Sequence, residues 1–151
     1  MNRLLKQWKA LVAVCYLMAS VAPAVADGRS AKFNYLLRCS GCHDQDGTGL
    51  PSAGIPALPG YIDAFAGDDE GRTYIAHVPG VVATGLTDVE IAAVLNYVID
   101  RWGDPKTVEP FTEAEVKKRR AEPVSDVVAY RRRIVERLKT SGVKIADYPW
   151  P

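Results

Sequence analysis

Cys39-Ser40-Gly41-Cys42-His43 is the most specific pattern in this 151-residue sequence. Two cysteines separated by two residues and followed by histidine form the signature of covalent haem attachment. The spacing has a physical reason, because thiols about one helical turn apart can each add to one vinyl group of the porphyrin. The imidazole of His43 then lies under the ring, where it can bind the iron. The motif therefore predicts one haem c, held by Cys39 and Cys42, with His43 as the proximal iron ligand.

Three other interpretations of the motif compete with haem attachment. A thioredoxin-like redox pair needs a preceding strand in a βαβ setting, and the sequence has no such pattern. A zinc site needs about four ligands, whereas the chain beyond residue 26 offers only the motif residues and the distant His77. A chance occurrence of so short a pattern is the third. Export and a helical pattern around the motif favour haem.

The N-terminal residues 1–26 have the features of a signal peptide. A basic start precedes the uncharged stretch Ala10–Ala26, which ends in small residues at the two positions that a signal peptidase reads. We expect cleavage after Ala26 and export to the periplasm. The alternative is an uncleaved membrane anchor, but the apolar run is shorter than the roughly 20 residues of a spanning helix. No membrane span is expected after cleavage.

Charge divides the rest of the chain into an acidic body and a basic tail. Residues 27–103 contain 5 basic and 10 acidic residues, and residues 104–151 contain 11 basic and 8 acidic residues. We therefore predict a haem domain at 27–103 and a basic helical C-terminal extension at 104–151.

The pattern of apolar residues predicts an all-α fold. Expected helices cover 29–37, 68–77, 88–102, 112–121 and 124–140, and Thr87 with Glu90 forms a capping box before the third of them. Residues 47–60 are rich in glycine and proline, which predicts an irregular loop.

Residues 29–102 resemble the class I c-type cytochromes, which carry a single haem. Tyr35, four residues before Cys39, matches the aromatic residue of their first helix, and Tyr97 matches the aromatic residue of the helix that crosses it. Pro56 matches the proline whose carbonyl orients the proximal imidazole. The resemblance implies the class I cytochrome c fold, with Tyr97 packed near Tyr35.

The same resemblance raises two further candidates for the haem site. Gly71-Arg72-Thr73-Tyr74 resembles a bacterial subgroup, and Arg72 could pair with a haem propionate; its alternative is a solvated surface arginine. The axial methionine of the family has no counterpart, because the only methionines are Met1 and Met18. His77 is the one remaining candidate for the sixth iron ligand, and its alternative is a surface histidine at a helix C-terminus.

The sequence favours an electron carrier over an enzyme. We expect one-electron transfer with a redox protein partner, such as a dehydrogenase or a respiratory protein. The alternative is a small haem enzyme or gas-ligand-binding protein, peroxidase-like or a sensor, with an open sixth iron position. The basic extension is expected to pack as a helical arm; the alternative, which can hold together with packing, is a docking surface for an acidic redox partner. Nucleic-acid binding is not expected.

Overall fold

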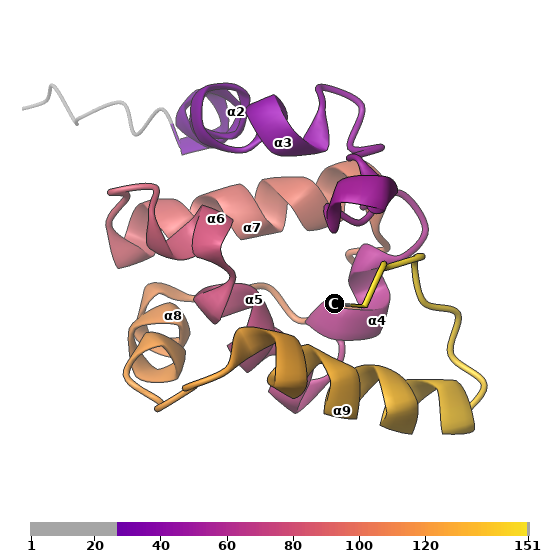
Figure 1. Ribbon diagram of the computed structural model, residues 1–151. Coiled ribbons are helices and arrows are strands. Elements are labelled where there is room, and N and C mark those ends of the chain that lie inside the picture. Colours follow the sequence, from indigo (N-terminus) through magenta and orange to yellow (C-terminus); the bar gives the residue numbers. More distant parts are fainter. Residues whose placement is uncertain (1–26, 151) are drawn as a thin grey trace, which may run out of the picture.

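The computed structural model describes residues 27–150, with side chains from residue 31 onward, and its regular elements are helices joined by loops (Figure 1). The elements are α2 (Asp27–Arg38), α3 (Ser40–His43), the 3-10 helix η1 (Pro51–Ala53), α4 (Ile62–Ala66), α5 (Asp69–His77), α6 (Pro79–Val82), α7 (Asp88–Trp102), α8 (Glu113–Arg120) and α9 (Val127–Thr140). The described residues contain no strand, only an isolated bridge between Leu50 and Ile55. The all-α prediction is confirmed. The predicted signal peptide and its cleavage site lie outside the described residues.

Helices α2 and α7 cross and pack together through aromatic side chains (Figure 1). Tyr35 is 1% exposed, and its ring centroid lies 5.7 Å from that of Tyr97 and 5.1 Å from that of Trp102. Tilted aromatic pairs at such distances are favourable beyond the area they bury. Val94 and Val98 of α7 complete this cluster. The expected contact between Tyr35 and Tyr97 is thus present.

The start of α7 is fixed by its capping box. The Thr87 side chain accepts a hydrogen bond from the backbone N–H of Glu90, and the Glu90 carboxylate accepts one from the backbone N–H of Thr87. Both bonds satisfy donors that a helix N-terminus leaves unpaired. α7 ends at Trp102, as the sequence predicts, and Gly103 follows as its C-cap.

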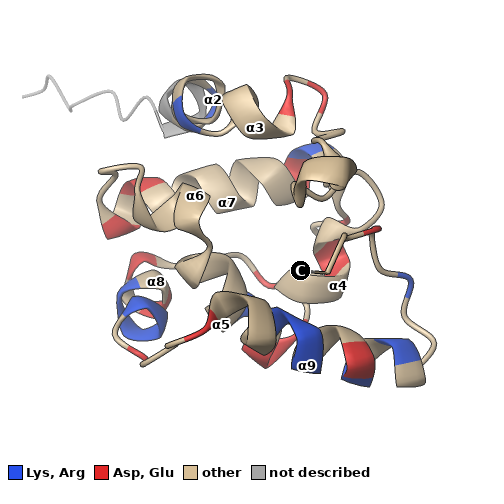
Figure 2. Cartoon of the chain, viewed as in Figure 1, with Lys and Arg blue, Asp and Glu red and all other residues tan. Residues whose placement is uncertain are grey.

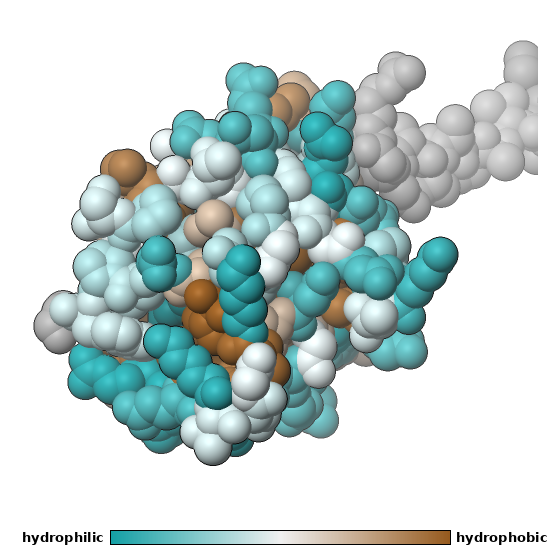
Figure 3. All heavy atoms as spheres, turned by 90° about the vertical axis from the view of Figure 1, so that its right-hand side faces the viewer, coloured by the Kyte–Doolittle hydropathy of each residue, from teal (hydrophilic) through white to brown (hydrophobic). Residues whose placement is uncertain are grey.

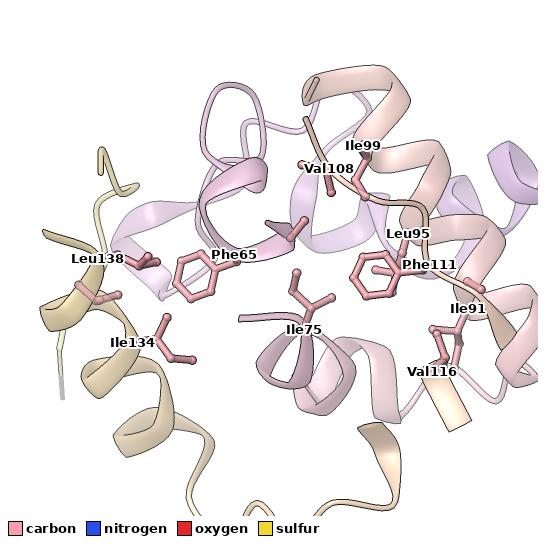
Figure 4. Packing of buried hydrophobic residues seen from close by; sticks show 13 residues of the cluster. Phe65, Ile75, Ile91, Leu95, Ile99, Val108, Phe111, Val116, Ile134 and Leu138 are labelled. Atoms are coloured by element: carbon pink, nitrogen blue, oxygen red, sulfur yellow. The ribbon is translucent and has the colours of Figure 1, made fainter. Parts of the chain in front are cut away.

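Within the described part of the chain, residues 104–150 share a hydrophobic core with the preceding helices. Figure 4 shows Ile134 and Leu138 of α9 facing Phe65 of α4, and Phe111 beside Leu95 of α7. Ile134 is fully buried, and burying a side chain of this size stabilises a fold by about 1.5–3 kcal/mol. The C-terminal helices therefore contribute to the stability of the helices that precede them.

Ion pairs reinforce this packing. Lys and Arg gather on α8 and α9, whereas the ribbon of α3 and α6 carries few charges (Figure 2). Three arginines of the extension bind carboxylates of the body: Arg119 binds Asp69 at 2.8 Å, Arg120 binds Asp88 at 2.5 Å, and Arg137 binds Asp68 and Glu70 at 2.7 and 2.8 Å. Three of the 11 basic residues of the extension thus pair with carboxylates of the preceding helices, which favours the packing interpretation of the arm.

None of the helices in residues 27–150 combines the length and the apolar character that a membrane span requires.

Candidate haem-attachment site

The haem-attachment motif forms a short helix directly after α2. Backbone hydrogen bonds from Cys42 and His43 to the carbonyl of Cys39 (3.1 and 2.9 Å) close its turn, and the Ser40 hydroxyl donates to the carbonyl of Leu36 at 2.7 Å. Cys39 is half-buried, Cys42 is exposed, and both thiols are free. Burial raises the pKa of the Cys39 thiol. Two free thiols one helical turn apart, one half-buried and one exposed, suit attachment to a ring that lies against this helix.

His43 presents one ring nitrogen to the protein. Its Nδ1 is buried and makes no hydrogen bond. Burial lowers the pKa of His43, and the nearby carbonyl of Pro56 and the carboxylate of Asp44 oppose this effect. A neutral imidazole is the form that ligates iron. The carbonyl of Pro56 thus lies on the side of the ring where a bond to Nδ1–H would fix its orientation.

The loop 47–60 holds Pro56 in this place. The N–H of Gly49 donates to the carbonyl of His43 at 3.1 Å, and the N–H of Leu58 donates to the carbonyl of Gly47 at 2.8 Å. Gly49 has a φ of +63°, and a Cβ at this position would lie 2.8 Å from the carbonyl oxygen of Pro56. Only glycine therefore allows this close approach. The glycine- and proline-rich sequence predicts the loop, but it does not reveal that residue 49 must be glycine.

Arg72 does not face solvent. The side chain is 9% exposed, and its Nε and Nη2 each donate to a carboxylate oxygen of Glu115 at 2.6 Å. Nη1 donates to the carbonyls of Ala66 and Glu109, and the guanidinium lies 3.7 Å from the centroid of Phe111. These contacts use the guanidinium to anchor α8. They argue against both the expected propionate contact and the alternative of a solvated arginine.

His77 is also engaged by the extension. Its Nδ1 lies 2.8 Å from the carbonyl oxygen of Thr73, and its Nε2 lies 2.9 Å from the carbonyl oxygen of Glu122. An imidazole ligates iron through a ring nitrogen that is free of other partners. With both nitrogens engaged, this arrangement argues against His77 as the sixth ligand.

The segment between α5 and α7 offers apolar side chains. Residues 78–86 contain Val81 and Leu86, which are packed against the core, and Thr84, whose hydroxyl donates to the carbonyl of Val81 at 2.8 Å. No three His, Cys, Asp or Glu side chains of residues 27–150 gather as a metal-ion ligand set. The zinc interpretation thus finds no ligand cluster in the described part of the chain.

The comparison with known proteins agrees with this geometry. No protein-family profile matches the chain. It is 37% identical over 141 residues to a cytochrome c-552 of Thermus thermophilus, covering 78% of this chain and 92% of that protein. A second cytochrome c-552 from Thermus thermophilus is 37% identical over 120 residues, covering 64% of this chain and 91% of that protein.

The chain belongs to the class I c-type cytochromes with a single haem, and it carries haem c as an electron carrier. Both relatives bear the name cytochrome c-552, so the likeness extends to one kind of protein within that class. The residues present fit the group: two free thiols one turn apart, and an imidazole whose Nδ1 points into the protein.

Proposed function

We propose that this protein is an exported electron carrier of the periplasm in which Cys39 and Cys42 form the two thioether bonds to haem c. His43 is the proximal iron ligand, and Pro56 accepts the hydrogen bond that orients its ring. The observation that carries this assignment is the pairing of an exposed Cys42 with the inward-facing Nδ1 of His43 on one short helix. Haem supplies the one-electron chemistry, and these residues hold and orient it.

The electron exchange is proposed to occur at the attachment edge. Cys42 is exposed there, and Leu37 of α2, five residues before it, is 60% exposed. A haem edge near the surface allows a partner to approach without a change in fold. The partner is proposed to be a dehydrogenase or a respiratory protein. The ion pairs of the extension leave less basic charge for docking than the sequence alone suggests.

Attachment is tested by replacing each cysteine separately. Cys39→Ala and Cys42→Ala each leave one thioether, which shifts the absorption of the pyridine complex of the reduced haem to longer wavelength. Cys15→Ala is the matched control, since Cys15 lies in the predicted signal peptide. An unchanged spectrum in either motif variant contradicts the assignment. The mass of the protein from the periplasmic fraction tests export, and we expect Asp27 as its first residue.

A second candidate function is the binding of a small ligand at the sixth position of the iron. It is favoured by the engaged nitrogens of His77 and by a sequence without methionine after Met18. The test is carbon monoxide binding to the reduced protein, with His77→Ala beside the wild type. Rapid binding by both proteins supports an open position. A protein that binds carbon monoxide only after His77 is replaced establishes bis-histidine ligation and removes this candidate.

A further inference from the structure

Arg131 is a buried cation without an anion. The residue is 2% exposed, and its Nε and Nη2 are buried without a hydrogen-bond partner. Within residues 31–150, the only other buried side-chain nitrogen or oxygen without a partner is Nδ1 of His43. No carboxylate of the described residues pairs with Arg131, although Arg119, Arg120 and Arg137 of the same extension all have one.

Three aromatic rings surround the guanidinium of Arg131. Its central carbon lies 4.6 Å from the centroid of Phe65, 5.4 Å from that of Tyr74 and 4.6 Å from that of Tyr148. Ring faces attract a cation, but they do not satisfy the directed N–H groups of its fork. A desolvated charge requires an oppositely charged, hydrogen-bonding partner. The rings of Phe65, Tyr74 and Tyr148 thus form an aromatic cage around Arg131. What this cage lacks is an anion whose oxygens could accept hydrogen bonds from the guanidinium.

The cage lies on the side of the molecule away from the attachment helix. Tyr148 packs on the loop 47–60, because a Cβ at Gly54 would lie 3.6 Å from its ring. In Figure 1, α3 lies at one end of the molecule, whereas α4, α5, α9 and the C-terminal segment lie toward the other. Apolar side chains form a small area among hydrophilic ones on the face that this segment crosses (Figure 3).

The chemistry of haem supplies the missing anion. Its two vinyl groups, to which the thiols of Cys39 and Cys42 would add, lie on one edge of the porphyrin, and its two propionates lie on the opposite edge. A ring attached at α3 therefore directs its carboxylates away from α3, toward the helices that hold the cage. Arg72 is committed to Glu115, so Arg131 is the buried arginine of the described residues that retains free donors.

We propose that Arg131, on the C-terminal extension, forms the ion pair with a haem propionate, and that Tyr74 and Tyr148 position its guanidinium. The extension thereby completes the haem site and raises the reduction potential, because a buried cation beside the ring disfavours the oxidised, more positive iron. The proposal rests on the haem c that the family carries. A wild type without covalent haem releases its haem on denaturation, so that failure is distinguishable from the outcomes below.

The test compares the reduction potentials of three holoprotein variants with that of the wild type. Arg131→Gln removes the charge, Arg131→Lys keeps it, and Arg133→Gln is a matched control with the same charge change at an exposed site two residues away. We expect Arg131→Gln to shift the redox equilibrium toward the oxidised form at least tenfold, which is about 59 mV for one electron. Arg131→Lys and Arg133→Gln are expected to shift it less than threefold.

A second readout follows the propionate itself. Without its cation, the buried carboxylate binds a proton more readily, so the potential of Arg131→Gln varies with pH between about 5 and 8, where that of the wild type is constant. Redox difference infrared spectra of protein with ¹³C-labelled propionates then show a protonated carboxyl band in the variant only. Equal potentials and equal pH profiles for Arg131→Gln and Arg133→Gln overturn the proposal. That result would mean that Arg131 only stabilises the fold through its contacts with the three rings.

Discussion

Replacing Glu115 with glutamine tests how much the ion pair between α8 and Arg72 of α5 stabilises the fold. The Glu115 carboxylate accepts two hydrogen bonds from Arg72 and one from Arg119. Because Arg72 is buried, Glu115→Gln leaves its charge without a counterion, and one of its two donors then faces the amide NH2, which cannot accept a hydrogen bond. Loss of one partner of a buried pair is more costly than the pair is worth.

The magnitude follows from the titration of the carboxyl. The pKa of Glu115 is lowered from 4.5 to about 2, mainly by the hydrogen bonds from Arg72 and to a smaller extent by the bond from Arg119. At about 1.4 kcal/mol per pH unit, the difference corresponds to about 3 kcal/mol, which partial exposure of the carboxylate reduces to about 2 kcal/mol. Because the pKa is lower in the folded state, this stabilisation is complete above pH 4.5 and is lost as the pH falls toward 2.

The assay is urea unfolding of the holoprotein at several pH values. At pH 7, Glu115→Gln is expected to lower the free energy of unfolding by about 2 kcal/mol, and the difference from the wild type should shrink as the pH falls below about 4.5. Glu113→Gln, an exposed change on the same helix, is the control and should lie within about 0.5 kcal/mol of the wild type. Equal stabilities of the two variants at pH 7, or a difference for Glu115→Gln that persists at about pH 2.5, would refute the reasoning.

Three further predictions concern the loop, a cap and the core. Gly49→Ala strains a positive φ and displaces the carbonyl of Pro56. It should destabilise the protein by about 1–3 kcal/mol and weaken the bond between iron and histidine, as measured by resonance Raman spectroscopy. The control Gly80→Ala, whose added Cβ meets no neighbouring atom, should have neither effect. Thr87→Ala removes the cap of α7 and should cost about 1 kcal/mol in urea unfolding, a prediction that an unchanged midpoint would contradict. Ile134→Ala should cost about 2–5 kcal/mol, and circular dichroism and haem absorbance should report one common transition; separate transitions would show that the extension unfolds alone.

Local patterns in the sequence were sufficient for the framework of this fold. The capping pair Thr87 and Glu90 predicted the start of α7. The crossing of α2 and α7, with Tyr35 against Tyr97, was implied by the resemblance to the class I c-type cytochromes. The short helices α4 and α6 were missed. Each has only four or five residues, and glycine or proline beside so short a segment conceals any helical periodicity.

Contacts between distant residues could not be predicted in the same way. Arg72 lies 43 positions from Glu115, and His77 lies 45 positions from Glu122. From the sequence, Arg72 and His77 could both be assigned to the haem, because no local pattern shows where their partners Glu115 and Glu122 lie in the fold. The individual roles of Cys39, Cys42 and His43 stay predictions, although the class of protein is confirmed.

The helical position of Arg131 indicates that it is buried, but its place in a run of three arginines concealed this in the sequence. In the run Arg131-Arg132-Arg133, three adjacent cations suggest a solvated surface, yet the first of them lies three or four positions from Val127 and from Ile134 and Val135. That spacing places it on the apolar face of α9, and there it is buried while its two neighbours are exposed. A cation on the buried face of an amphipathic helix needs an anion from elsewhere in the molecule. The extension engages Arg72 and His77, and in the proposed arrangement it also supplies Arg131 as the cation for a haem propionate.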